Sequence, residues 1–174
     1  MAILRQIAQL CHPVLRQPAS RVQDFTDPTL ASLVEDLLVT LAASGGVGIA
    51  APQVYVSRRV IVVASRPNAR YPHAPLMEPL VLVNPELVWS SQETEDGWEG
   101  CLSIPGIRGL VPRAVGVKAG YQTAGGESRT LELEGFPARI FQHEMDHLDG
   151  LVFLDRITNN RNVISDQEYL RQFK

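Results

Sequence analysis

Apolar residues follow a helical period in the segment TDPTLASLVEDLLVTLAASGG. They stand at i, i+3, i+4, i+7, i+8 and i+11, and they are Leu30, Leu33, Val34, Leu37, Leu38 and Leu41. Such spacing places them along one face of a helix. Thr26 or Asp27 can serve as the N-cap. Because glycine commonly ends helices, Gly45 or Gly46 marks the other end, and the pattern predicts a helix over residues 28–43.

Elsewhere the apolar runs are short and are separated by turn signals. We expect an irregular arm over residues 5–25, which show little periodicity, and a loop over PNARYPHAPLMEP. Strands are predicted over RRVIVVAS and over residues 109–111, 115–121 and 128–134, and LVLVNPELVWSS is predicted to form two short strands joined near Asn84 and Pro85. Many short strands with few helices between them favour antiparallel sheet with segregated helices.

A second helix is predicted over GFPARIFQHEMDHLDG, residues 135–150. Pro137 suits the first turn and Gly150 suits the end. His143 and His147 stand four residues apart, so they lie on the same face of this helix. The predicted fold class is therefore α+β, with short antiparallel strands packed around this central helix and the N-terminal helix packed outside. The tail DQEYLRQFK can form a further short helix.

Composition narrows the class of protein. With 174 residues and 45% hydrophobic residues, the chain is predicted to form a single domain over residues 1–174. A net charge of -3 does not indicate the basic face that nucleic-acid binding needs. The sequence has no run of membrane-spanning length and no secretory leader pattern. We therefore expect a soluble, cytoplasmic protein, with an organelle protein trimmed of its transit peptide as the alternative.

The HEMDH stretch offers metal chemistry. Two imidazoles four residues apart on a helix can bind one metal ion, and the Glu144 carboxylate then lies beside it as a base. The plainer interpretation is a chance match, in which both histidines are ordinary exposed helix residues. A catalytic site of the zinc type takes three protein ligands and leaves one position open, so a third ligand decides between the two.

Three positions are candidates for that third ligand. The pattern with a third histidine fails, because its place holds Phe153. Glu168 lies farther downstream, but LVFLDRITNNRNVISD, which separates it from His147, does not look like a continuing helix. Cys101 lies in EGCLSIPG, where flanking glycine and proline let the backbone bend and aim a thiolate. The alternative for Cys101 is a buried, inert thiol.

A third stretch, GVGIAAPQ at residues 46–53, surrounds one polar side chain, Gln53, with small residues. Val47 and Gly48 can lie extended beside a substrate backbone and pair with it, while Gly46 and Gly48 allow close approach. Gly100 can contribute from the opposite wall. A glycine turn that merely ends the first helix explains Gly46 but not Gln53, and the phosphate-binding patterns are absent from the sequence.

Taken together and in this order, GVGIAAPQ, EGCLS and QHEMDH resemble the three signature motifs of peptide deformylases. That family removes the N-formyl group from newly made polypeptides in bacteria and organelles. The resemblance extends over most of the chain, including MAILRQI and IPGIRGLVPR. It implies metal ligands at Cys101, His143 and His147. It also implies that Glu144 is the general acid and base, Gln53 the amide donor to an oxyanion, and Leu102 the donor of a second, backbone N–H.

The resemblance also implies a pocket for a methionine side chain, lined by Val47, Ile140 and the apolar part of Arg139. Arg139 departs from the aliphatic residue of many relatives, and it is expected either to reshape the pocket or to swing out toward the substrate chain. Asp146 is a candidate to pair with an arginine such as Arg113 and so orient the site, the alternative being a solvent-facing carboxylate.

The implied partners are N-formyl-methionyl nascent peptides, with the ribosome as a further candidate. Ferrous iron is the metal that the resemblance implies, and zinc, nickel or cobalt can occupy such a site. Two other function classes stay open at this point. One is a zinc endopeptidase with Glu168 as third ligand, and the other is a structural metal domain whose fourth protein ligand closes the site.

Overall fold

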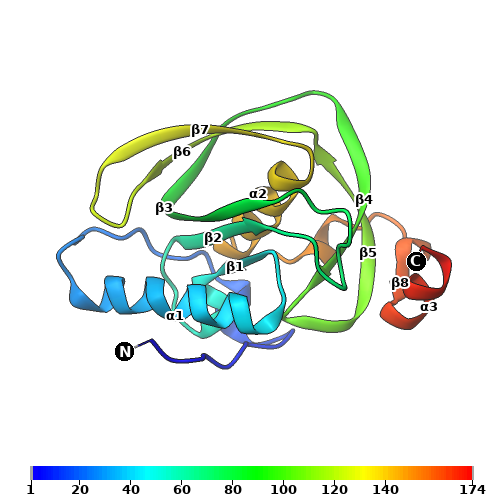
Figure 1. Cartoon of the computed structure of the whole chain (residues 1–174), viewed down its shortest axis with the longest axis horizontal. Helices are drawn as coiled ribbons and strands as arrows, with labels where there is room; N and C mark the ends of the chain where they lie inside the picture. Colours follow the sequence, from blue (N-terminus) through cyan, green and yellow to red (C-terminus); the bar gives the residue numbers. More distant parts are fainter. Residues whose placement is uncertain (1, 174) are drawn as a thin grey trace.

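The structure, a computed structural model, describes residues 2–173 and contains two antiparallel sheets and three α-helices (Figure 1). The helices are α1 (Pro28–Ser44), α2 (Gly135–Leu148) and α3 (Asp166–Gln172). The larger sheet has the order β1-β2-β3-β6-β7, formed by Gly48–Ala50, Val60–Ser65, Met77–Ser90, Gly116–Gln122 and Ser128–Glu134. The smaller sheet has the order β4-β5-β8, formed by Thr94–Cys101, Ile104–Ala114 and Val163–Ser165. These elements confirm the predicted α+β class.

The buried strand β2 separates two parts of the core. Ile61 and Val63 pack in the cluster that includes the apolar face of α2, whereas Val60 and Val62 pack in the cluster that includes α1. Successive side chains of a strand point to opposite faces, so one short strand can serve both helices. As a result α2 lies inside the molecule and α1 outside it, as Figure 1 shows. This is the arrangement that the sequence predicts.

The predicted ends of α1 are confirmed. The Asp27 side chain accepts a hydrogen bond from the backbone N–H of Thr29, which makes Asp27 the N-cap. Gly45 follows the last turn with φ of 64°, a left-handed conformation that glycine adopts without strain. No helix within residues 2–173 has both the length and the apolar composition needed to cross a bilayer.

The prediction of two short strands around Asn84 and Pro85 is wrong, because β3 runs through both residues as one strand. Asn84 adopts φ of 49° where the register with β6 shifts, so it forms an irregularity within the strand and not a turn. Its side chain accepts from the N–H of Val22 at 2.8 Å and donates to the carbonyl of the same residue at 2.8 Å. The buried asparagine thus anchors the N-terminal arm to the sheet.

Other strand boundaries also differ from the prediction. The expected loop over residues 67–79 ends earlier, because β3 begins at Met77. The strand expected over 109–111 extends over all of β5, and β4 and β8 were not predicted. The sequence of β4, TEDGWEGC, combines acidic residues with glycine and so lacks the apolar alternation that indicates a strand. Pairing with β5 holds it in place.

Candidate active site

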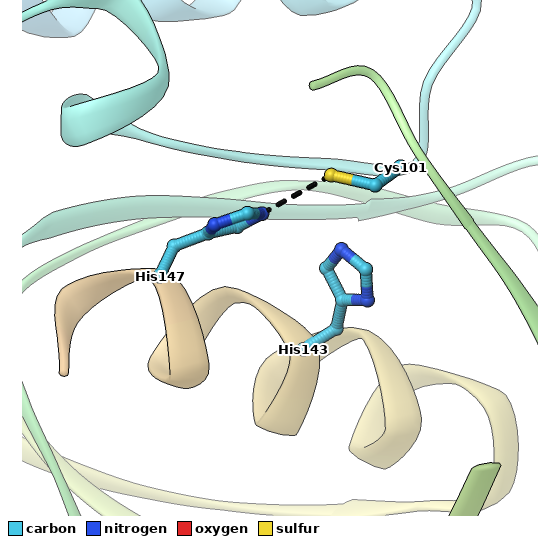
Figure 2. Close-up of side chains that lie close together, drawn as sticks. All are labelled: Cys101, His143 and His147. Atoms are coloured by element: carbon cyan, nitrogen blue, oxygen red, sulfur yellow. Dashed lines mark hydrogen bonds between the residues drawn. The ribbon is translucent and has the colours of Figure 1, made fainter. Parts of the chain in front are cut away.

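Three side chains from two distant segments meet beside α2. His143 and His147 project from one face of this helix toward Cys101 at the end of β4, as Figure 2 shows. The Sγ atom of Cys101 lies 3.3 Å from Nε2 of His147. One donor atom from each of the three residues lies within 4.8 Å of the other two. The predicted third ligand from EGCLS is therefore close enough to share one ion with both imidazoles.

The charge around this cluster suits a cation. Burial opposes ionisation of Cys101, yet the adjacent His147 and His143 rings lower the pKa of its thiol well below the usual value. Burial also opposes a charge on His143, yet Cys101 and Glu99 raise the pKa of that imidazole well above its usual value. The thiol and the rings thus stabilise each other's charged forms, and Glu99 adds to the effect on His143. A thiolate with two imidazoles is a donor set for zinc or ferrous iron, so these residues fit the implied metal.

Glu168 is not part of this cluster. It lies on α3, where its side chain is 43% exposed and bonds to Arg171 and Gln172. Across residues 2–173, the group of cysteine, histidine and acidic side chains that could hold an ion comprises only Cys101, His143 and His147. The prediction of Glu168 as an alternative third ligand is therefore wrong. A fourth protein ligand that would close the site is likewise not found in the described chain.

Glu144 is buried between α2 and β1. Its Oε2 atom has no hydrogen-bond partner within the described residues, and burial raises the pKa of its carboxyl to about 7. A Cβ atom at Gly48 would collide with Oε1 of Glu144 and with Ile140. Glycine at position 48 therefore lets β1 approach the carboxylate closely. A buried carboxyl with a pKa near neutrality can both accept and return a proton.

Gln53 is held in one orientation. It lies in the 3-10 turn Ala51–Val54 that follows β1, and it is 1% exposed. Its Oε1 accepts from the backbone N–H of Ala50 at 2.9 Å. Its Nε2 donates to Ser103 Oγ at 3.2 Å and lies 3.5 Å from Cys101 Sγ. The amide hydrogens therefore point toward the thiolate. The Ser103 hydroxyl helps to orient them, and no pattern in the sequence indicated this role.

Glu99 is a functional candidate that the sequence analysis missed, although it precedes Cys101 by only two residues in the same motif. Its Oε2 lies 2.9 Å from Nδ1 of His143. Arg113 bonds both oxygens of Glu99, at 2.9 and 3.0 Å, and also bonds Asp146 at 2.7 Å. The predicted pairing of Asp146 with Arg113 is therefore confirmed. Burial opposes ionisation of Glu99, but Arg113 and His143 lower its pKa well below the usual value.

Arg139 reaches the same carboxylate from α2. Its Nη1 donates to Oε1 of Glu99 at 3.0 Å and to the carbonyl of Val111 at 2.8 Å, and its Nη2 donates to the carbonyl of Glu95 at 2.6 Å. A Cβ at Gly97 would lie 2.6 Å from Cζ of Arg139, so the guanidinium fills the space that a side chain there would need. Arg139 therefore reshapes the wall, and the expectation that it swings out is wrong.

A cleft opens over the cluster. It is lined by most of the predicted site residues, namely Gly46, Val47, Gly48, Gln53, Gly100, Cys101, Leu102, Arg139, Ile140, His143 and Glu144. His147 is fully buried beneath it. Five further lining residues were not predicted as site residues, namely Glu99, described above, and Arg70, Tyr71, Trp98 and Phe136. β1 and β4 are edge strands of the two sheets, so the cleft is flanked by backbone that no neighbouring strand pairs on that side.

Comparison with known proteins agrees with this geometry. The family model described as polypeptide deformylase matches residues 4–163. Peptide deformylase 2 of Nostoc sp. is 52% identical over 166 residues, which cover 95% of this chain and 93% of that protein. Peptide deformylase 2 of Shewanella oneidensis is 49% identical over 150 residues, which cover 86% of this chain and 82% of that protein.

Solved structures give the same result. A Met-Ala-Ser-bound class I type b peptide deformylase from Acinetobacter baumannii is 47% identical, with a TM-score of 0.87 over 90% of this chain and 100% of that one. The peptide deformylase of Thermotoga maritima is 38% identical, with a TM-score of 0.80 over 90% of this chain and 99% of that one. Sequence, fold and the meeting of three motifs agree, and this chain belongs to the polypeptide deformylase family.

Proposed function

We propose that this chain hydrolyses the N-formyl group of formyl-methionyl peptides and releases formate and a free N-terminus. The observation that carries the proposal is the convergence of Cys101, His143 and His147 at the floor of one cleft, with Glu144 and Gln53 beside them. The sequences with the highest identity quoted above bear the name peptide deformylase. A single catalytic domain over residues 1–174 fits a site that combines Gln53 with His147.

Cys101, His143 and His147 would hold the metal. A divalent cation there supplies Lewis acidity, which polarises a carbonyl group and favours ionisation of water near neutral pH. Glu99 accepts from the second nitrogen of His143 and so orients that ring toward the cluster. Proton transfer and stabilisation of the oxyanion are carried out by side chains and a backbone N–H of the chain.

Glu144 is the proposed proton carrier. Its carboxylate takes a proton from the attacking water and later passes it to the amine nitrogen that leaves the formyl carbon. The Nε2 group of Gln53 and the backbone N–H of Leu102 donate to the formyl oxygen as negative charge develops on it. Loss of one such donor typically costs about 2.7–4 kcal/mol of transition-state stabilisation. Because the Gln53 amide is already oriented in the free enzyme, it needs little rearrangement to act.

The substrate backbone is proposed to extend along the free edge of β1. Gly48, at the start of β1, and the preceding Gly46 and Val47 offer it extended backbone at a sheet edge, and Gly100 lines the cleft from the other sheet. The methionine side chain enters between Val47, Ile140 and the apolar stem of Arg139. The Acinetobacter baumannii structure holds a peptide that begins with methionine, which supports this placement.

Ferrous iron is the proposed working metal, with zinc, nickel or cobalt able to take its place. The thiolate ligand makes an iron-loaded site sensitive to oxygen, so prolonged aeration should inactivate the enzyme. If activity is unchanged after aeration, the catalytic metal is not ferrous iron. Because its substrates are nascent chains, the proposed setting is the bacterial cytoplasm near the ribosome.

Formate release tests the proposed reaction directly. The enzyme is supplied with a formyl-Met peptide and, as the matched control, with the acetyl-Met form of the same peptide. We expect formate from the first and no comparable deacetylation of the second. Equal turnover of both, or no turnover of the formyl peptide by metal-loaded enzyme, would refute the proposal.

A further inference from the structure

We propose that Arg70 is a specificity-determining residue that binds a carboxylate side chain at the second or third residue of the formyl-Met substrate. The inference rests on the proposed function, because it assumes that a peptide leaves the cleft past this residue. Arg70 lies in the loop between β2 and β3 and lines the cleft beside Tyr71 and Trp98.

The position of the guanidinium is the first observation. Its Nη2 lies 2.7 Å from the place that a Cβ atom at Gly100 would take. The cationic group of Arg70 therefore lies where a side chain of β4 would otherwise project, in the cleft that Gly46 and Gly48 also line. A peptide that pairs with the β1 edge and places its methionine near Ile140 occupies this same cleft.

The backbone of Arg70 is anchored while its charge is not. Its N–H donates to Oδ1 of Asn68 at 2.8 Å, and its carbonyl accepts from Arg108 at 3.4 Å. The next residue, Tyr71, accepts from the N–H of Gly100 at 3.3 Å and so ties the loop to β4. The guanidinium itself takes part in no hydrogen bond or ion pair among residues 2–173. A fixed attachment point with a free cation suits recognition of an incoming anion.

The other charged groups of the cleft are engaged at its deep end. Glu99, Arg139 and His143 form one hydrogen-bonded group, and Glu144 is buried against Gly48. Arg70 is therefore the charged group of the cleft that is left for a substrate side chain. The whole chain carries a net charge of -3, so its overall field does not attract acidic peptides. Preference for them has to come from a local cation.

The test compares peptides that differ only in charge. Formyl-Met-Asp-Ser-amide is paired with formyl-Met-Asn-Ser-amide, and formyl-Met-Ala-Glu-amide with formyl-Met-Ala-Gln-amide. The blocked C-terminus removes the terminal carboxylate as a second source of the same chemistry. For the wild-type enzyme we expect kcat/KM to favour the acidic member of at least one pair by about three- to fivefold, as a partly exposed ion pair allows.

Variants assign the preference to one side chain. In Arg70→Gln the acid-to-amide ratio should fall to about one, and in Arg70→Glu the acidic peptide should become the poorer substrate. Arg66→Gln is the matched control, because Arg66 belongs to the same loop but does not line the cleft, and it should keep the wild-type ratio. A salt concentration of about 1 M should weaken the wild-type preference, because the ion pair is partly exposed.

Three results would overturn the inference. The first is a wild-type acid-to-amide ratio of kcat/KM near one for both peptide pairs. The second is a wild-type ratio that is unchanged in Arg70→Gln. The third is an equal loss of activity on all four peptides in that variant, which would show a purely structural role for the loop. Failure of the proposed function looks different. In that case the wild-type enzyme would release no formate even from the uncharged peptides.

Discussion

The cleft contains two arginines whose surroundings differ completely. At its deep end Arg139 donates to the Glu99 carboxylate and to backbone carbonyls of β4 and β5. At its mouth Arg70 uses only its backbone in hydrogen bonds and leaves its guanidinium free within the described chain. The same residue type therefore serves structure in one place and is available to a ligand in the other. The two roles differ in whether the guanidinium is hydrogen-bonded to the protein, and not in how close the arginine lies to the site.

This difference extends to the other polar groups of the deep end. Gln53, Glu99 and the two histidines are each positioned by at least one neighbour before substrate arrives. Preorganised groups of this kind stabilise a transition state without moving. Substitutions at the deep end should therefore change turnover by large factors, whereas substitutions at the mouth should change substrate preference by small ones.

Removal of the thiolate is expected to have the largest effect. Cys101→Ala leaves only the two histidines as ligands, so bound metal and formate release should both be lost. Metal content by elemental analysis and formate release check this. The matched control is Cys11→Ala, which removes an exposed cysteine and should retain both. Full metal content in Cys101→Ala would contradict the proposed ligand set.

Neutralising the proton carrier should have the next largest effect. Glu144→Gln keeps the shape of the side chain but cannot accept a proton, so kcat should fall by about 10²–10⁴-fold. Bound metal and folding should be unchanged, as measured by elemental analysis and circular dichroism. The control is Glu168→Gln on α3, which should have wild-type kinetics. Wild-type turnover in Glu144→Gln would assign the proton transfer to another group.

Loss of the amide donor should be smaller. Gln53→Leu removes the hydrogens aimed at the cluster while keeping a side chain of similar size, and kcat should fall by about 10²–10³-fold. Because the amide acts on charge that develops in the transition state, KM should change much less than kcat. Steady-state kinetics on a formyl-Met peptide separate the two. A variant with raised KM and unchanged kcat would show that Gln53 binds the ground state instead.

The smallest deep-end effect is expected at Arg139. Arg139→Met removes one of the arginines that face Glu99 but leaves Arg113 in place, so the free energy of unfolding should fall by about 1–3 kcal/mol. Urea denaturation measures this change. Arg139→Lys should recover only part of it, because lysine lacks the planar fork that reaches several acceptors. The acid-to-amide preference should stay at its wild-type value, in contrast to Arg70→Gln.

Several parts of the fold could be predicted because their signals are local. The apolar period of α1 and its two caps lie within one segment, and so does the spacing that puts His143 and His147 on one face of α2. β3 and β4 could not be predicted in the same way. Asn84 reads as a turn residue, yet long-range bonds to Val22 hold it inside a strand. β4 lacks apolar alternation and depends on its pairing with β5.

The same distinction between local and long-range signals applies to the residues of the site. The sequence by itself determined which residue types carry the chemistry, and its three motifs pointed to Cys101, Glu144 and Gln53. Only the tertiary structure decided that Glu99 orients His143, that Arg139 is bonded to the sheet and that the Arg70 guanidinium has no partner among residues 2–173. The physical reason is that helical periodicity and caps act over a few residues. Partners of a buried charge are brought in from distant strands and loops, so they become known only once the chain has packed.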